Sequence, residues 1–357
     1  MVLKTPDYWD QTSHLKMIDE IFQESMKNKL DDLVLLRIFD EETNSHRNDT
    51  ILVEEGLTWV SFIPENSEYP DANPWESDTF TMTKYKYGAK VVITEEMKKY
   101  NEIGSMKERI RSIVDEGMEM IEQSLADILL YGFSTSAYTD VFGKSTGAVG
   151  QKGYALFNST DNNIIKIGAT TNPELSVQAL DAAYVMWRTS KNTLGQYKSV
   201  KYDTLLVSPA LRALADQLVS SDRLPWSSDN AVNFNKGRYK VLESNRLSTR
   251  SDGTDTSAYW FVFDSKKIKN QLKVKWAKKP ELKAVGEVIF DANEVHRFSF
   301  WYSRGFLNFN YIAGSQGTAS VAKKGIAVEV VNTASNPVYT EAATATATET
   351  ETETETA

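Results

Sequence analysis

Apolar residues in the first part of the chain recur at helical spacing in two places. The first stripe consists of Leu15, Ile18, Ile21 and Phe22. The second runs from Leu33 to Phe39. Neither stripe is long enough to enclose a core of its own, so residues 1–47 are predicted to form an N-terminal arm with two helical segments.

Two strand-like segments follow, separated by a turn-forming stretch. They read ILVEEGLTWVSF from Ile51 and FTMTKYKYGAKVVIT from Phe80, and both are rich in β-branched and aromatic residues. The stretch between them contains three prolines, Pro64, Pro70 and Pro74. Because proline cannot donate to a strand ladder, residues 48–93 are predicted to form an extended β-hairpin with an irregular tip. Such a hairpin has little core and needs a partner surface.

The strongest helical pattern follows Gly104. Ser105 and Glu108 have the spacing of a capping box, which predicts the helix start. One helical face is apolar and contains Met106, Ile110, Ile113, Val114, Ile121, Leu125, Ile128 and Leu129. Gly132 is placed to end the helix. The predicted helix, residues 105–131, would be roughly 40 Å long and would serve as a structural spine.

A loop rich in Gly, Ser and Thr, residues 134–153, leads to another helical pattern. Thr171, Asn172 and Pro173 introduce this helix. Its predicted apolar face contains Leu175, Leu180, Ala183, Tyr184 and Trp187.

The next region alternates between strand and helix patterns. The run YDTLLVSPALRALADQLV predicts a strand from Thr204 to Val207, with Ser208 as helix N-cap and Pro209 at the first helical position. Further strands are predicted from Tyr239 to Leu242 and from Trp260 to Phe263. This alternation is typical of an α/β unit.

The last part of the chain changes character twice. The segment VHRFSFWYSRGFLNFNYIAG, which begins at Val295, is aromatic and partly alternating. It predicts long strands, within residues 291–336, that return to the earlier body. The chain then ends in TEAATATATETETETETA. With repeated like charges and few apolar side chains this segment cannot offset its ordering entropy, so residues 337–357 are predicted to be a disordered tail.

Composition excludes several classes of protein. The chain has 357 residues and no cysteine, which excludes a disulfide framework and a thiolate metal site. Its formal net charge of −9 opposes tight general binding to nucleic acid, because phosphate affinity comes mainly from clustered Lys and Arg. No apolar stretch approaches the roughly 18 residues of a membrane span, and the N-terminus lacks the apolar core of a signal peptide. We expect neither membrane insertion nor export by that route.

One serine stands in a pattern known from hydrolases. The residues from Gly143 to Gly147 match G-x-S-x-G, in which the serine lies on a strand-to-helix elbow. No helical pattern follows Ser145 directly, so a flexible turn is the preferred interpretation and a hydrolase the alternative. The same residues include Gly-Lys-Ser, but a phosphate-binding loop needs glycine where this chain has Tyr138. No catalytic or cofactor-binding residue is predicted.

Neither the histidines nor the clustered lysines of the chain predict a metal site or a nucleic-acid site. His14, His46 and His296 are far apart and lack the spacing of a helical zinc site, so no metal site is predicted. A group of lysines occurs in VKWAKKPELK and consists of Lys273, Lys275, Lys278 and Lys279. In an acidic chain, a solvated or subunit-facing patch is the preferred interpretation, and a nucleic-acid contact is the alternative.

The order of these elements resembles a known family. Arm, hairpin, spine helix, α/β unit and returning strands are arranged as in the major capsid subunits of tailed phages, the Hong Kong 97 type of fold, and most closely in the Mu-like branch. The resemblance rests on MTKYKYGAKVVITEEM, GYALFNSTDNN, ALDAAYVMWR, YDTLLVSPALRALADQL and HRFSFWYSRGFLNFNY. These segments lie in the family's order and cover most of residues 50–312.

The resemblance implies an α+β fold divided into several parts. The hairpin would lie over a neighbouring subunit, and residues 94–194 and 291–336 would form a peripheral domain. Residues 195–290 would form an axial domain around the centres of hexamers and pentamers. The Lys–Asn cross-link that some members form cannot be matched to residues here.

The implied function is structural. The chain would self-assemble in the host cytoplasm into the icosahedral head of a virion and enclose double-stranded DNA without sequence-specific binding. The implied partners are a separate scaffold protein, a portal and decoration proteins, with no membrane. An encapsulin-type compartment of the same fold, which holds protein cargo, is the alternative.

Three aromatic residues are candidates for the contact between subunits. Tyr69 and Trp75 lie at the predicted hairpin tip, and Trp59 lies in the preceding strand. Aromatic side chains are enriched at interfaces and also in cores, so packing within one subunit is the alternative interpretation.

Overall fold

The computed structural model describes residues 11–57, 63, 65, 68–69, 74–100, 102–147, 153–159, 162–191, 197, 199–224, 231–287, 294–307 and 309–318. The helices are α1 (Gln11–Asp32), α2 (Glu95–Lys99), α3 (Ile103–Leu130), α4 (Val177–Thr189) and α5 (Pro209–Ser220). The longer strands are β2 (Asn48–Leu57), β3 (Pro74–Thr83), β4 (Tyr85–Ile93), β12 (Leu272–Glu287) and β13 (Glu294–Phe306). The shorter strands include β1 (Asp40–Thr43), β5 (Ala137–Thr139), β6 (Ser145–Gly147), β9 (Thr204–Val207), β10 (Lys240–Glu243), β11 (Trp260–Phe263) and β14 (Ile312–Ser315). This mixture of helices and sheets confirms the predicted α+β class.

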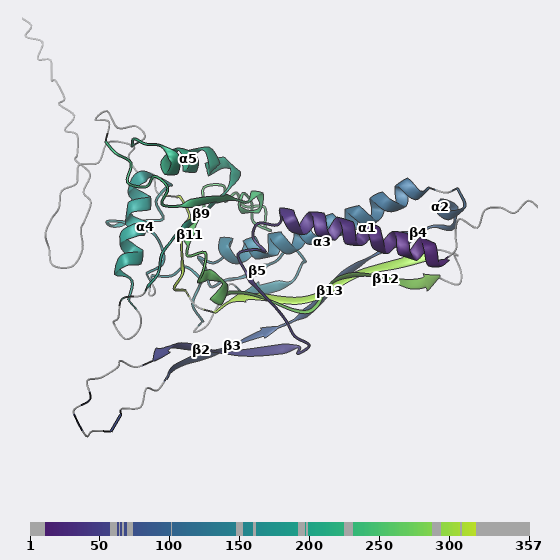
Figure 1. Cartoon of the computed structure of the whole chain (residues 1–357), viewed down its shortest axis with the longest axis horizontal. Coiled ribbons are helices and arrows are strands. Elements are labelled where there is room, and N and C mark those ends of the chain that lie inside the picture. Colours follow the sequence, from purple (N-terminus) through teal and green to yellow (C-terminus); the bar gives the residue numbers. More distant parts are fainter. Residues whose placement is uncertain are drawn as a thin grey trace, which may run out of the picture.

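These elements form an elongated molecule of three parts (Figure 1). At one end, α1 and α3 lie side by side along the long strands β4, β12 and β13. At the other end, α4 and α5 flank β9 and β11. The ribbon of β2 and β3 projects below both units. We call the first part the body, the second the α/β unit and the third the ribbon.

The body is built on a four-stranded sheet in the order β1–β12–β13–β4. β1 runs parallel to β12, and the other neighbours are antiparallel. β12 and β13 contain 16 and 13 residues, so at about 3.4 Å per residue the pair extends for more than about 40 Å. Phe298, Phe300 and Tyr302 of β13 are buried in the same core as the apolar face of α3. A long helix and a long strand pair thus cover each other along their length.

The spine helix begins earlier than the capping box predicts. α3 starts at Ile103, with Glu102 as a residue whose side chain makes no capping hydrogen bond, and Ser105 lies inside the first turn. The N–H of Glu102 donates to the carbonyl of Met97, which connects α2 closely to α3. Met97 and Met106 are both buried in the core. Tertiary packing of these methionines therefore sets the helix start in place of the predicted serine cap.

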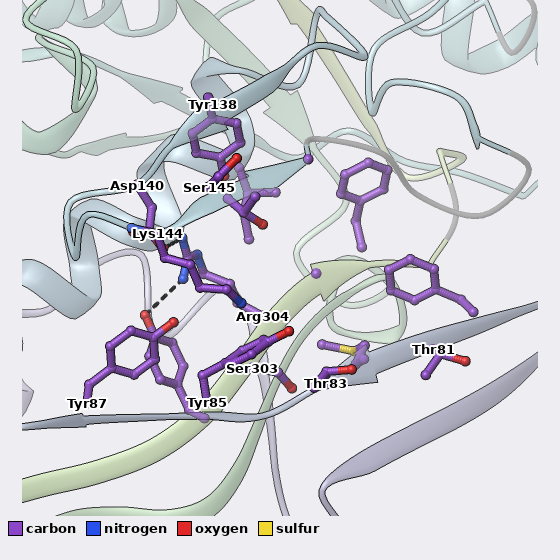
Figure 2. A pocket seen from close by; sticks show the side chains of 18 residues that line it. Thr81, Thr83, Tyr85, Tyr87, Tyr138, Asp140, Lys144, Ser145, Ser303 and Arg304 are labelled. Carbon is purple, nitrogen blue, oxygen red and sulfur yellow. Dashed lines mark hydrogen bonds and ion pairs between the residues drawn. The ribbon is translucent and has the colours of Figure 1, made fainter.

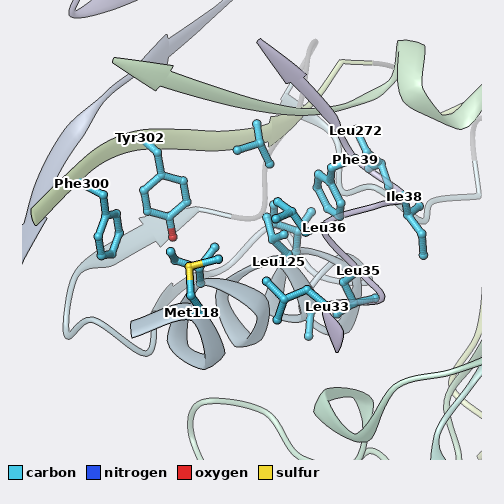
Figure 3. Close-up of a cluster of buried hydrophobic side chains, with 14 of the residues drawn as sticks. Leu33, Leu35, Leu36, Ile38, Phe39, Met118, Leu125, Leu272, Phe300 and Tyr302 are labelled. Carbon is cyan, nitrogen blue, oxygen red and sulfur yellow. The ribbon is translucent and has the colours of Figure 1, made fainter. Parts of the chain in front are cut away.

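The second helical stripe of the arm does not form a helix, and that prediction is wrong. Residues 33–39 form consecutive turns, in which the N–H groups of Ile38 and Phe39 both donate to the carbonyl of Leu35. Figure 3 shows the apolar side chains of this segment gathered beside α3. The carboxylate of Glu122 on α3 accepts the N–H groups of Val34 and Leu35, each at 3.0 Å. The carboxylate of Glu122 thus accepts two backbone N–H groups that would otherwise need the hydrogen bonds of a helix.

The α/β unit has its own sheet, in the order β10–β9–β11–β14, and its own core. α5 begins at Pro209 after Ser208, as predicted, but the Ser208 hydroxyl donates to the carbonyl of Ser257 and does not cap the helix. α4 begins at Val177, later than the predicted start at Pro173. Its N-cap is Ser176, whose hydroxyl accepts the N–H of Ala179 at 3.2 Å.

The grouping of elements differs from the predicted division at three places. α4 falls in the predicted region 94–194 but packs in the core of the α/β unit. β12 falls in the predicted region 195–290 but belongs to the sheet of the body. β14 falls in the predicted region 291–336 but is an edge strand of the α/β unit. The chain crosses between the two units several times, which a division into consecutive segments cannot reproduce.

Candidate assembly surfaces

The ribbon is set apart from the two packed units (Figure 1). Its register places Asn48 opposite Thr83 and Leu57 opposite Pro74, with two irregular steps between. At its base, Met82 is buried and Phe80 is half-buried. A Cβ atom at Gly305 of β13 would lie 3.2 Å from the ring of Phe80, so the base of the ribbon packs closely on the body.

The predicted second strand of the hairpin is in fact two strands. Lys84 separates β3 from β4, and β4 pairs with β13 in the body sheet. The hairpin predicted over residues 48–93 is therefore too long and ends at Thr83. The backbone N–H of Lys84 donates to the carbonyl of Arg47 at 2.9 Å, which closes the base of the ribbon at this point.

The Lys84 side chain is the most heavily bonded group at this base. Its ammonium lies 2.7 Å from the carboxylate of Asp49, and the two side chains are 2% and 8% exposed. It also donates to the side chain and carbonyl of Asn44 and, at 2.8 Å, to the carbonyl of His46. Burial alone would raise the pKa of Asp49, but Lys84 and Asn44 together lower it below its usual value. An ionised pair thus fixes the ribbon to the segment before it.

The three predicted interface residues are not brought together by the described structure. Tyr69 is 81% exposed. Trp59 lies outside the described residues, and Trp75 lies in β3 with its side chain outside them. Sequence reasoning missed Lys84. In the sequence Lys84 stands inside the strand-like run FTMTKYKYGAKVVIT, where a lysine is ordinarily a solvated residue and gives no sign of its buried role.

The lysines of β12 mostly bind acidic groups of the same chain. Lys273 pairs with Asp40 and Glu42 of β1, and Lys275 pairs with Glu42 at 2.9 Å. Hydrogen bonds from Lys275 and then Lys273 lower the pKa of Glu42. The prediction of a solvated or subunit-facing patch is therefore wrong for Lys273 and Lys275, because they join β1 to β12. Lys279 remains exposed.

A polar cavity of about 310 Å³ lies where the ribbon base, β4, β13 and the β5–β6 hairpin meet (Figure 2). Beside it, Arg304 and Asp140 form a buried ion pair at 2.9 Å, and Arg304 also donates to the Tyr302 hydroxyl. Burial raises the pKa of Tyr87 to about 12, so this phenol stays neutral. The arrangement joins the β5–β6 hairpin to β13.

The cavity does not have the geometry of a hydrolase site. Ser145, which lines it, begins a strand of a two-stranded hairpin and not a strand-to-helix elbow. No histidine is among the residues that line it in the described part of the chain. His296 is buried elsewhere, 2.8 Å from the carboxylate of Glu294, while His46 is exposed. Among the described residues that line the cavity, the Ser145 alternative thus lacks a histidine partner.

Across the described ranges, no group of three or more His, Cys, Asp or Glu side chains is placed to hold a metal ion. Of the described helices, none combines the length and the apolar character needed to cross a membrane.

Comparisons with known proteins give one family. A family model described as phage capsid protein matches residues 78–314. No curated protein matches the sequence. Among solved structures, the capsid of the cyanophage P-SCSP1u is similar with 11% identity, a TM-score of 0.48, and coverage of 79% of this chain and 87% of that chain.

Two other solved structures are similar at the same level. One is from the Gordonia phage Cozz, with 11% identity, a TM-score of 0.46, and coverage of 82% of this chain and 87% of that chain. The other is a virus-like particle from Pyrococcus furiosus, with 10% identity, a TM-score of 0.46, and coverage of 84% and 98%. Because the family model spans well over half of the 357 residues, the chain belongs to the phage capsid protein family, so it is a structural component of a virion shell and not an enzyme.

Proposed function

We propose that this chain is the major capsid protein of a tailed phage of the Mu-like branch. Hexamers and pentamers of the chain form an icosahedral head around double-stranded DNA. The observation that carries the proposal is the ribbon of β2 and β3, which extends away from both packed units and whose described contacts with the body lie at its base (Figure 1). Membership of the phage capsid protein family supports a role in a shell, and the ribbon supports contact between copies of the chain.

The physical argument starts from the stability of a ribbon. An isolated two-stranded hairpin is at best marginally stable in water, so the ribbon gains order when it lies on a neighbouring subunit. A contact between different surfaces of identical chains is heterologous, and rotation can close it into rings. We place Tyr69, Trp75 and Trp59 in this contact. The exposure of the Tyr69 ring supports that placement, because burying it on a neighbour would be favourable.

The two packed units fit two roles in the shell. In this proposal the body, with α3 as its spine, is the peripheral domain. The α/β unit, which has a separate core and sheet, is the axial domain at the centres of hexamers and pentamers. The division follows the observed sheets, so β12 belongs to the peripheral domain and α4 and β14 to the axial domain.

A shell that encloses DNA needs other proteins for its assembly, and these are the proposed partners. A scaffold protein and a portal would direct assembly in the host cytoplasm, and decoration proteins would bind the finished shell. The net charge of −9 supports a container that does not hold DNA tightly, because a strongly basic wall would bind phosphates. Binding to the genome would be independent of sequence.

Electron microscopy and sedimentation of the purified chain, alone and co-expressed with its neighbouring genes, test the proposal. The expected result is closed shells, or rings of five and six copies. A chain that stays a monomer under every condition would contradict it. The contents of the shells separate a capsid from an encapsulin-type compartment, because the first encloses DNA and the second a protein cargo.

A further inference from the structure

The polar cavity beside Arg304 opens where two neighbouring strands of the body sheet part. β4 pairs with β13 as far as Tyr85 opposite Tyr302. β13 continues to Phe306 with β12 as its partner on the other side. In the described part of the chain, no strand pairs with β13 on the β4 side beyond Tyr302. The cavity lies along this free edge of β13 (Figure 2).

The cavity has an open side and a buried inner wall. Tyr85 and Ser145, which line it, are exposed, so the cavity is open to solvent on their side. Tyr138, Ser303 and Phe306 are buried and form the inner wall. Its volume of about 310 Å³ equals that of roughly ten water molecules. A small molecule or a single long side chain therefore fits inside.

The carboxylate of Asp140, one of the residues that line the cavity, is fully used within the chain. One of its oxygens accepts the backbone N–H groups of Phe142 at 3.0 Å and Lys144 at 2.8 Å. The other oxygen accepts a hydrogen bond from Arg304 at 2.9 Å. The charges of Asp140 and Arg304 compensate each other, so neither explains the second cation of the cavity.

That second cation is Lys144 of the β5–β6 hairpin. Its ammonium lies over the ring of Tyr85, 2.7 Å from the centroid. In the described part of the chain, no carboxylate pairs with it. An aromatic face attracts a cation but leaves N–H donors of the ammonium for another acceptor. With two cations and one carboxylate, the residues that line the cavity have a formal charge of +1.

Two donors of the cavity walls are also without a partner among the described residues. They are the hydroxyl of Ser303 and the Nε–H of Arg304. Each of these side chains is only 8% exposed. Buried polar groups ordinarily have a hydrogen-bond partner, because leaving them without one costs free energy. An acceptor bound in the cavity would provide one.

The tyrosines of the cavity do not oppose a negative ligand. Burial raises the pKa of Tyr138 and Tyr302 above the usual value of a phenol. Both side chains therefore stay neutral at ordinary pH. A neutral phenol can donate a hydrogen bond, so these residues add donors and no negative charge.

We propose that this cavity is a binding site for a carboxylate group, held by Lys144 and by the free donors of Ser303 and Arg304. One uncompensated positive charge matches the single charge of a carboxylate, whereas a phosphate monoester carries about −1.5 to −2 at pH 7. The inference goes beyond the proposed function, because it assigns a ligand to the subunit itself. The ligand joins the β5–β6 hairpin, through Lys144, to the free edge of β13, through Ser303.

A carboxylate has two sources, a free small molecule or an acidic side chain of another protein chain. Two matched pairs of probes represent them. Acetate and acetamide have nearly the same shape and differ in charge. The α-amides of N-acetyl-glutamate and N-acetyl-glutamine differ in the same way and resemble side chains within a protein. In each pair the charged probe should raise the thermal unfolding temperature of the full-length chain and reach saturation, because a ligand that binds the folded state stabilises it. The neutral probe, and sodium chloride at equal concentration, should not.

Two substitutions test the residues. Lys144→Met should raise the dissociation constant for acetate on the order of tenfold or more, because it removes a charge-assisted hydrogen bond. Ser303→Ala should also weaken binding, but without acetate it should leave the unfolding temperature unchanged or higher, since the hydroxyl that it removes has no partner. Lys266→Met is the matched control, because Lys266 is exposed and does not line the cavity. This control should respond to acetate as the unmodified chain does.

Assembly, followed by sedimentation velocity, distinguishes the two sources. If the ligand is a free molecule, shells form equally well with acetate and from Lys144→Met. If it is an acidic side chain of another chain, acetate competes with assembly and Lys144→Met weakens it. Both results support the carboxylate site.

Other outcomes would overturn the inference and leave the capsid function standing. One is an equal response to the charged and neutral probes. Another is a full response to acetate from a chain that carries both Lys144→Met and Ser303→Ala. A chain that binds acetate through these residues but stays a monomer under every condition would keep the inference and overturn the proposed capsid function.

Discussion

The body and the ribbon of this subunit are stabilised in opposite ways. In the body, Phe300 lies in a cluster of rings with Tyr87, Trp276 and Tyr302, whose centroids are 5.6 to 6.5 Å from its own. In the ribbon, the described anchors lie at the base, where Lys84 is bonded to Asp49 and its neighbours and Met82 is buried against β13. The body is held by its own apolar packing, whereas the described bonds of the ribbon lie at its base, and we propose that the remainder contacts another copy.

This difference shows how one chain can be both a stable subunit and an assembly unit. A body with a continuous core has its stabilising contacts within one chain. A ribbon without such a core keeps its backbone and charges available until a partner arrives. Substitutions in the two regions should therefore separate folding from assembly.

The largest effect is expected from Phe300→Ala in the body. This substitution removes a buried ring from the aromatic cluster and should lower the free energy of unfolding by about 3 to 5 kcal/mol. Chemical denaturation followed by circular dichroism measures the change. Phe234→Ala is the matched control, because Phe234 is exposed and should stay within about 0.5 kcal/mol of the unmodified chain. Equal effects of the two substitutions would mean that the body core does not carry the stability.

The next effect is expected from Lys84→Met at the base of the ribbon. Methionine keeps much of the apolar stem but leaves the carboxylate of Asp49 buried without its counter-ion, which costs on the order of 3 kcal/mol. Hydrogen exchange should show the loss of protection at the amide of residue 84 and in the neighbouring ribbon pairs, with α3 unchanged. The added substitution Asp49→Asn should recover part of the loss, since it removes the unpaired charge. A uniform loss across α3 would contradict a local role for Lys84.

Local patterns were sufficient to predict the helices with strong signals. α5 begins at Pro209 because a proline at the first helical position and an apolar face are both properties of neighbouring residues. The long α3 follows from its apolar periodicity in the same way, although its first turn does not. Where the structure depends on distant residues, the sequence was a poor guide. Lys273 is an example, because its partners Asp40 and Glu42 are more than 230 residues away.

The candidate assembly surfaces show the same limit. The sequence of the strands and prolines was enough to predict that the hairpin has little core of its own. The change of sheet at Lys84 could not, because β4 is drawn into the body by its pairing with β13, which lies about 200 residues further along the chain. A row of cations across the body sheet was also missed, since it combines Lys90 of β4 and Lys283 of β12 with Arg297 of β13. Only the register places these charges together.

A smaller effect is expected from acid at the ribbon base. The pKa of Asp49 is lowered in the folded chain, so its contribution to stability is present above its unfolded pKa of about 3.9 and is lost as the pH falls through the folded value. On α3, burial raises the pKa of Glu122 and Asp127. A raised carboxyl pKa makes stability depend on pH in the opposite direction. Stability from these two groups is present at low pH and is lost as the pH rises through their folded values.

Hydrogen exchange between about pH 5 and pH 3 should therefore show the ribbon base losing protection before the segments around Glu122. The effect should be smaller than that of Lys84→Met, because a protonated Asp49 can still accept a hydrogen bond. Asp49→Asn should remove this part of the pH dependence. If the ribbon base and α3 lost protection together, the Asp49 pair would not be the acid-sensitive group.

The smallest effect on folding is expected from Tyr69→Ala near the end of the ribbon. The Tyr69 side chain is 81% exposed, so its loss should change the free energy of unfolding of the single subunit by less than about 0.5 kcal/mol. Assembly should nevertheless be weakened, because an aromatic ring buried at an interface often contributes about 1 to 2 kcal/mol or more. Tyr100→Ala is the control, since Tyr100 is 74% exposed but lies in the body after α2. Sedimentation of the unmodified chain and the two variants at equal concentration measures the difference. Unchanged assembly of Tyr69→Ala would remove this residue from the proposed contact between subunits.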